Sequence, residues 1–143
     1  MYFSKIAKVT VLTTVLTIGT ISANARENGS KAFDWGPLMD AITYVESGGN
    51  SRAVSGKSCG AMQITPCAVQ QCNIILKQRG IKKRYTLNDR FSVQKSREMF
   101  VLIQSYYNPT NDVERAIRIW NGGPRYKVKS TNGYYRKVMK AYK

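Results

Sequence analysis

The residue types in this chain leave few routes for chemistry. Its 143 residues include no histidine, which excludes a Ser/His/Asp triad, a Cys/His nucleophile pair and a metal site that needs imidazole ligands. The three cysteines, Cys59, Cys67 and Cys72, form no Cys-x-x-Cys pair, so we expect no structural metal. Proton transfer would therefore depend on one of eight carboxylates or on tyrosine, lysine or cysteine.

Glu46 has the most unusual position among these carboxylates. It comes near the end of an expected helix that starts around Asp34 and Pro37 and stops at Gly48. At 100° per residue it falls about 80° from Leu38, which places it beside the apolar stripe. Burial and the helix C-terminus would both raise its pKa, as a general acid near neutral pH requires. The alternative is an ordinary surface glutamate paired with a cation.

The elements that must position Glu46 are short amphipathic helices separated by glycine and proline. After the first helix, we expect a second from Thr65-Pro66 to Gly80 and a third from Ser92 to Asn108-Pro109. A fourth should start at Asn111, in a capping box with Glu114, and end at Gly122-Gly123-Pro124. A fifth should start at Thr131. Residues 51–64 are rich in Gly, Ser and Ala, which favours a loop or small hairpin in which Ala61–Ile64 is extended. The sequence predicts a single α+β domain, predominantly α-helical, with a small β or loop insert after the helix that carries Glu46.

The cysteine spacing leaves the disulfide pairing open. Cys67 and Cys72 would lie about 140° apart on one helix, so they should not bridge each other. Cys59 could form a disulfide with either of them, and one cysteine must remain unpaired. We expect Cys59–Cys72, with no disulfide as the alternative.

The first 25 residues have the pattern of a secretory signal peptide. Lys5 and Lys8 precede an uncharged run over residues 9–23, and Ala23-Asn24-Ala25 supplies the small-x-small cleavage pattern. The apolar run is shorter than the ~20 residues that cross a bilayer. We therefore predict a signal peptide over 1–25 and a mature domain over 26–143, with retention as a membrane anchor as the alternative.

The basic excess belongs to the mature domain. The formal net charge is +15, and residues 26–143 hold 21 of the 23 basic residues and all eight acidic ones, which gives +13. Such an exported domain should meet an anionic partner: cell-wall polymer, lipid headgroups or released nucleic acid. We interpret the basic run at residues 82–84 as a solvated loop, because no nucleic-acid-binding fold or aromatic repeat surrounds it.

Four groups of residues resemble motifs of the soluble lytic transglycosylase family. Glu46-Ser47-Gly48, with Ser55 nine positions after the glutamate, resembles its catalytic motif, and Gly60-Ala61-Met62-Gln63 before Pro66 resembles its Gly-Leu-Met-Gln motif. Ile119–Pro124 resembles Ala-Tyr-Asn-Ala-Gly-Pro, and Thr131 with Tyr134 resembles a terminal Thr-x-x-Tyr helix. Together they span residues 35–139 in the family's order. Ala61, Trp120 and Ser130 depart from the usual Leu, Tyr and Glu.

The resemblance implies a lysozyme-like fold and a peptidoglycan substrate, cleaved between N-acetylmuramic acid and N-acetylglucosamine. Glu46 would first protonate the glycosidic oxygen and then take the proton of the muramyl 6-hydroxyl, leaving a 1,6-anhydro end. A single carboxylate suffices in this family, whereas most glycosidases use two. The implied substrate contacts are Ser55, Met62, Gln63, Trp120, Asn121 and Tyr134.

The same resemblance implies no metal and no cofactor, peptidoglycan strands as the partner, no nucleic-acid partner and a monomer in the periplasm or cell envelope. Membrane attachment would require that the signal peptide is retained. The alternatives are a hydrolytic muramidase similar to goose-type lysozyme, a wall-binding or assembly protein that does not cut, and a cationic membrane-active protein.

Overall fold

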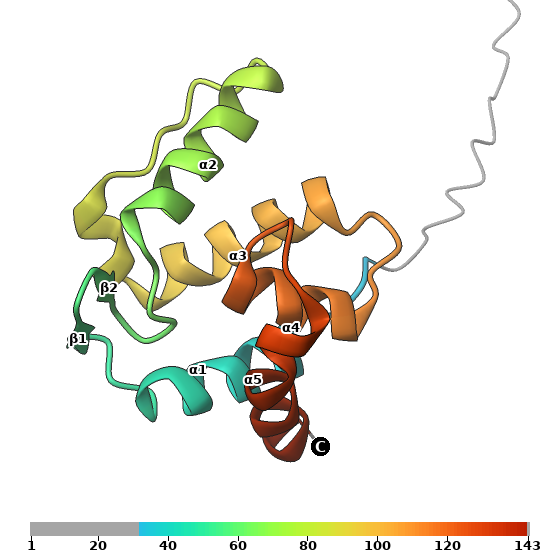
Figure 1. The fold of residues 1–143 in the computed structure, drawn as a ribbon. Helices are drawn as coiled ribbons and strands as arrows, with labels where there is room; N and C mark the ends of the chain where they lie inside the picture. Colours follow the sequence, from blue (N-terminus) through green and yellow to red (C-terminus); the bar gives the residue numbers. More distant parts are fainter. Residues whose placement is uncertain (1–31, 143) are drawn as a thin grey trace, which may run out of the picture. The chain divides into compact units, whose positions relative to one another are not determined.

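The computed structural model describes residues 32–142, so the expected signal peptide lies outside the described residues. The elements in this range are α1 (Gly36–Ser47), β1 (Val54–Ser55), β2 (Ser58–Cys59), α2 (Pro66–Gln78), the 3-10 helix η1 (Leu87–Phe91), α3 (Val93–Tyr107), α4 (Val113–Gly122) and α5 (Val128–Ala141) (Figure 1). This order confirms the predicted fold class. None of the helices described combines the length and the apolar character needed to span a bilayer.

Two helices begin where the sequence predicts, because their first turns are closed by local side chains. At the start of α2, the N–H of Ala68 donates to Thr65 Oγ1 at 3.2 Å, and Pro66 occupies the first helical position. At the start of α3, the N–H of Lys95 donates to Ser92 Oγ at 3.3 Å. Each signal depends only on residues within one turn.

The predicted start of α4 is wrong by one residue. The N-cap is Asp112, whose Oδ1 accepts from the N–H of Arg115 at 2.6 Å. Asn111 lies outside the helix with φ +55°, a left-handed conformation that asparagine tolerates better than most residues. Neighbouring Asn and Asp are both suitable caps, so the local pattern does not separate them.

The starts of α1 and α5 also differ from prediction. The N-cap of α1 is Trp35, although the Asp34 carboxylate still accepts from the N–H of Gly36 at 2.8 Å. The N-cap of α5 is Lys127, and Thr131 is buried inside the first turn of that helix. Thr131 is therefore a packed residue that contacts α4, and its hydroxyl does not begin the helix.

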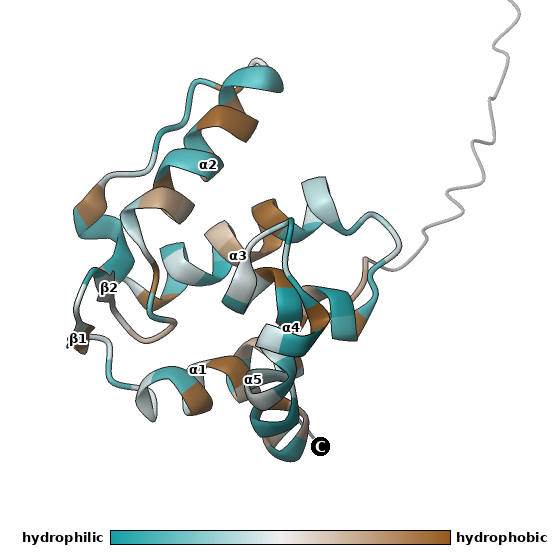
Figure 2. Cartoon of the chain, viewed as in Figure 1, coloured by the Kyte–Doolittle hydropathy of each residue, from teal (hydrophilic) through white to brown (hydrophobic). Residues whose placement is uncertain are grey.

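The core is formed by the apolar faces of the helices around α3. Phe100 lies at its centre, with ring centroids 5.6 Å from Trp35 and 5.1 Å from Trp120. Leu38 and Ile42 of α1 are buried beside it. Figure 2 shows both hydrophobic and hydrophilic residues on each helix, as burial of one face requires.

The insert after α1 is a short antiparallel hairpin in which Val54 pairs with Cys59 and Ser55 with Ser58. The expected hairpin is confirmed, but Ala61–Ile64 is mostly a turn, and within that segment only Ile64 forms a bridge, to Cys59. Gly60 has φ +80°, and a Cβ there would lie 1.8 Å from the Arg90 carbonyl oxygen. Only glycine permits this approach between the hairpin and η1.

The favoured Cys59–Cys72 disulfide is wrong, because all three cysteines are free in the structure. The thiol of Cys72 is buried between α2 and α3 and donates to the Met99 carbonyl oxygen at 3.7 Å. Cys59 belongs to β2 and Cys67 is exposed. Burial raises the pKa of the Cys72 thiol to about 12.

Candidate active site

Glu46 lies in the last turn of α1, and the chain turns sharply after it. Gly48 ends the helix with φ +62°, and its N–H donates to the Tyr44 carbonyl at 3.0 Å. The Glu46 side chain is partly buried, and its Oε1 accepts a hydrogen bond from the hydroxyl of Tyr134 at 2.7 Å. Tyr134 belongs to α5, which packs against α1.

Glu46 differs from every other carboxylate in the part of the chain that the structure describes. Four are ion-paired with Lys or Arg: Asp40, Asp89, Glu98 and Glu114. Two accept backbone N–H groups at helix starts: Asp34 and Asp112. Within residues 32–142, Glu46 has no ion pair, and its bond comes from a neutral hydroxyl. Among the described residues, no cation pairs with Glu46 as the alternative of an ordinary surface glutamate would require.

The surroundings of Glu46 favour its protonated form. Burial raises the pKa of Glu46, and the hydrogen bond from Tyr134 offsets only part of that rise. Burial and the neighbouring carboxylate raise the pKa of Tyr134 well above its usual range, so its hydroxyl keeps its proton and remains a donor. Glu46 therefore keeps its proton to a higher pH than an ordinary glutamate does, and the Tyr134 hydroxyl can stabilise the carboxylate that forms when the proton leaves.

A hydrogen bond from Ser47 connects the end of α1 to the turn after the hairpin. Ser47 Oγ donates to the Ala61 carbonyl at 2.7 Å. In the same turn, Gln63 has φ +51°, an uncommon value for a residue other than glycine. Its Nε2 donates to the carbonyl oxygens of Gly60 at 2.9 Å and Ala53 at 3.4 Å. The Gln63 side chain thus holds the turn to which Ser47, the residue after Glu46, is bonded.

A cavity of about 230 Å³ is lined by residues of this turn, of α2, of α3 and of the end of α4. Gln63, Trp120 and Asn121 line it, and its other lining residues are Ile64, Thr65, Cys67, Ala68, Gln71, Ile103, Tyr107, Ile119, Gly123 and Pro124. Trp120 Nε1 donates to the Met62 carbonyl at 3.3 Å. The cavity is therefore fixed to the same turn that Ser47 contacts.

The predicted site residues occupy four different places. Glu46 and Tyr134 are in direct contact, whereas Gln63, Trp120 and Asn121 line the cavity, whose lining does not include Glu46. Ser55 is exposed on β1 and belongs to neither group. The side chain of Met62 is 0% exposed and packs in the core, so only its carbonyl takes part in the site.

Sequence reasoning missed Arg118, which connects α4 to the helix that carries Tyr134. Arg118 is 4% exposed, and its Nη1 donates to Thr131 Oγ1 at 2.8 Å and to the Val128 carbonyl at 3.0 Å. It also pairs with Glu114 at 2.7 Å. A glutamate four residues before an arginine that has isoleucine on both sides is the sequence signal that could have identified it.

A comparison with protein-family models shows the family to which the chain belongs. The model described as Transglycosylase SLT domain matches residues 23–142, which is most of the sequence. The chain belongs to this family. SLT domain proteins are peptidoglycan lytic transglycosylases, which are glycosidic-bond lyases that act on the cell wall. No curated protein and no solved structure matches the chain significantly.

Membership in the SLT family confirms the family assignment made from the four motifs and agrees with the mostly helical, lysozyme-like fold. It also gives the chain's general activity, lytic transglycosylation of peptidoglycan.

Proposed function

We propose that this SLT protein is exported to the periplasm or cell envelope and cleaves the bond between N-acetylmuramic acid and N-acetylglucosamine, leaving a 1,6-anhydro end. Glu46 acts as general acid and then as general base. The observation that carries this proposal is the state of Glu46: within residues 32–142 it is the carboxylate that has no cation and is held by a neutral hydroxyl.

In the first step, protonated Glu46 donates its proton to the glycosidic oxygen while the bond from that oxygen to C1 of muramic acid breaks. Burial supports this step because it favours the protonated form. The Tyr134 hydroxyl, 2.7 Å from Oε1, stabilises the carboxylate as its charge develops.

In the second step, the Glu46 carboxylate removes the proton of the muramyl 6-hydroxyl, and the 6-oxygen forms a bond to C1. No water is consumed, and Glu46 regains the proton that it gave away. The sequence is compatible with a mechanism that uses one carboxylate, because no Asp or Glu occurs between Glu46 and Asp89. One carboxylate is enough when the nucleophile belongs to the substrate.

The remaining site residues bind the glycan. Gln63, Trp120 and Asn121 contact sugar through the cavity, where Trp120 supplies an aromatic face and Asn121 an exposed amide. Ser55 contacts the substrate from the exposed hairpin, and the Met62 carbonyl fixes Trp120. The reaction needs no metal or cofactor, because the proton and the nucleophile come from Glu46 and the substrate.

Mass spectrometry of fragments released from purified sacculi tests this proposal. We expect fragments with anhydromuramyl ends, each one water lighter than the hydrolysed product, and we expect Glu46→Gln to release none. Hydrolysed ends would identify a muramidase instead. Binding to sacculi without release would identify a wall-binding protein, and leakage of wall-free vesicles would identify a membrane-active one.

A further inference from the structure

A second groove lies between α1 and α5, on the side of α1 away from Glu46. Its lining residues are Pro37, Asp40, Ala41 and Tyr44 from α1 and Lys137, Lys140 and Ala141 from α5. Pro37, Ala41 and Tyr44 follow i, i+4, i+7 spacing and therefore share one face of α1. Tyr44 precedes Glu46 by two residues, which is about 200° around the helix. On α1, Glu46 and the groove therefore lie on different faces.

Tyr44 gives the groove an aromatic wall. Its side chain is 71% exposed, the highest value among the exposed large hydrophobic residues of the described chain. The small side chains of Ala41 and Ala141 lie beside it in the lining, which leaves room along the ring. An exposed tyrosine offers an apolar ring face together with a hydroxyl, a combination suited to a ligand that is partly apolar and partly polar.

The groove is positively charged. Lys137 and Lys140 are three residues apart on the same face of α5, and neither forms an ion pair within the described residues. The carboxylate of Asp40 is already engaged by Arg97, 2.6 Å away. No acidic residue follows Glu114 in the sequence, while nine basic ones do. A ligand in this groove would therefore meet unpaired ammonium groups.

We propose that this groove is a second glycan-binding site, which holds a peptidoglycan strand that is not being cut. The Tyr44 ring packs against the face of a sugar ring, and Lys137 and Lys140 pair with carboxylates of the peptide stems. The choice of ligand rests on the proposed function, because peptidoglycan carries sugars and carboxylates on one polymer. A recessed groove also fits a chain better than a flat lipid surface.

Such a site would keep the enzyme on the wall between cuts. While one strand occupies the Glu46 side of the helix pair, a neighbouring strand is held on the Tyr44 side, which raises the effective concentration of uncut bonds. The two lysines are solvent-exposed, so their contribution should weaken as salt screens them. Contact with the tyrosine ring should depend much less on salt.

Co-sedimentation with purified sacculi tests the groove, in a Glu46→Gln background so that the wall is not digested. We expect Tyr44→Ala to weaken binding about tenfold at all salt concentrations, whereas Tyr44→Phe retains it. We expect the double change Lys137→Gln/Lys140→Gln to weaken binding about fivefold at low salt and little at high salt. The matched control is Lys77→Gln/Lys82→Gln, which removes two exposed cations elsewhere and should change binding less than twofold.

The same groove variants with Glu46 intact should cleave short soluble glycan fragments at the wild-type rate. Equal losses in the groove and control pairs would overturn the proposal, because charge alone would then explain binding. Unchanged sacculus binding by both groove variants would also overturn it, as would losses confined to anionic phospholipid vesicles or single-stranded DNA. If the wild-type enzyme releases no anhydro ends, the proposed function fails, while the binding ratios still decide whether the groove holds wall polymer.

Discussion

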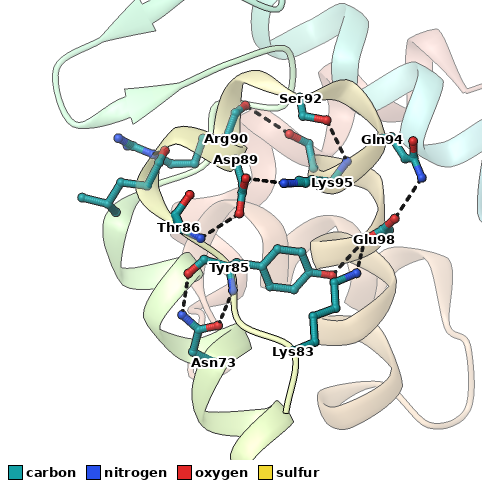
Figure 3. A network of polar contacts seen from close by, with 12 residues as sticks. Asn73, Lys83, Tyr85, Thr86, Asp89, Arg90, Ser92, Gln94, Lys95 and Glu98 are labelled. Carbon is teal, nitrogen blue, oxygen red and sulfur yellow. Dashed lines mark hydrogen bonds and ion pairs between the residues drawn. The ribbon is translucent and has the colours of Figure 1, made fainter. Parts of the chain in front are cut away.

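Two Glu–Tyr pairs in this protein have opposite electrostatic character. Glu46 accepts from the Tyr134 hydroxyl at 2.7 Å, and Glu98 accepts from the Tyr85 hydroxyl at 3.2 Å. Glu98 also meets Lys83 Nζ at 2.6 Å, as Figure 3 shows, and this lysine is the main cause that lowers the pKa of Glu98. Glu46 has no such partner in the described chain, and burial raises its pKa.

The comparison indicates that a tyrosine beside a glutamate does not by itself make a proton donor. Glu98 belongs to a network that fastens the segment before η1 to α2 and α3: Asn73 makes two 2.8 Å bonds with the backbone of Tyr85, and Asp89 pairs with Lys95 (Figure 3). These contacts stabilise ionised carboxylates. Within residues 32–142, partial burial without an ion-pairing cation is the feature that distinguishes Glu46.

The largest expected difference between the pairs is catalytic. Replacing Glu46 with Gln removes the transferable proton, so we expect sacculus turnover to fall at least ~10²-fold. Glu98→Gln is the matched change and should leave turnover within about twofold, because that carboxylate contacts Lys83, Tyr85 and Gln94 and has no contact with Glu46. Release of anhydromuropeptides, measured by mass spectrometry, checks both variants. Comparable losses in the two would contradict the assignment of the acid.

Removing the tyrosine hydroxyl from each pair should give a smaller difference in activity than replacing the glutamates. Tyr134→Phe deletes the hydrogen bond that lowers the pKa of Glu46, so that pKa should rise further. Because the acid must be protonated, activity is lost as pH rises through this pKa, and the basic limb of the profile should move to higher pH. We also expect turnover to fall about tenfold, since the developing carboxylate loses its donor. Tyr85→Phe should leave the shape of the pH–rate profile unchanged.

Arg118→Met tests whether the position of Tyr134 matters for Glu46, because Arg118 holds the start of the helix that carries Tyr134. Its bonds to Thr131 and the Val128 carbonyl would be lost, and we expect about 2 kcal/mol of destabilisation in urea unfolding. Turnover should fall a few-fold, with the basic limb displaced in the same direction as in Tyr134→Phe. Arg136→Met, an exposed cation on the same helix, serves as the control and should change neither quantity.

The smallest expected effect is on folding stability. The pKa of Glu46 is raised in the folded state, so the unfolded chain loses its proton first and stability decreases as pH rises above the ordinary glutamate pKa. Glu46→Gln should therefore raise Tm at pH 7, and the gain should disappear at pH values below that ordinary pKa. Glu98 has a lowered pKa, so Glu98→Gln should have the opposite sign. Thermal melts at several pH values measure both.

The sequence predicted what depends on local spacing. The position of Glu46 beside an apolar stripe followed from helical periodicity, and the starts of α2 and α3 followed from Thr65 with Pro66 and from Ser92. The tyrosine that meets Glu46 lies 88 residues later in the chain, and the family resemblance implied it only as a substrate contact.

The errors have a common physical origin in contacts between distant segments. Thr131 is inside α5 because Arg118, thirteen residues earlier, takes its hydroxyl as an acceptor. Cys72 is drawn into the core by packing between α2 and α3, which spacing within one helix does not reveal. Ser47 donates to the carbonyl of Ala61, fourteen residues away. The Glu-Ser-Gly motif includes Ser47 but does not predict this partner.

The long separation between Glu46 and Tyr134 has a consequence for biosynthesis. The acid is translated early and its donor arrives with the last helix, so a nascent or truncated polypeptide carries Glu46 without Tyr134 and without α5 packed against α1. We expect a chain ended at residue 130 to release no fragments from sacculi. The proposed acid and its hydrogen-bond donor therefore come together only after the last helix has been synthesised.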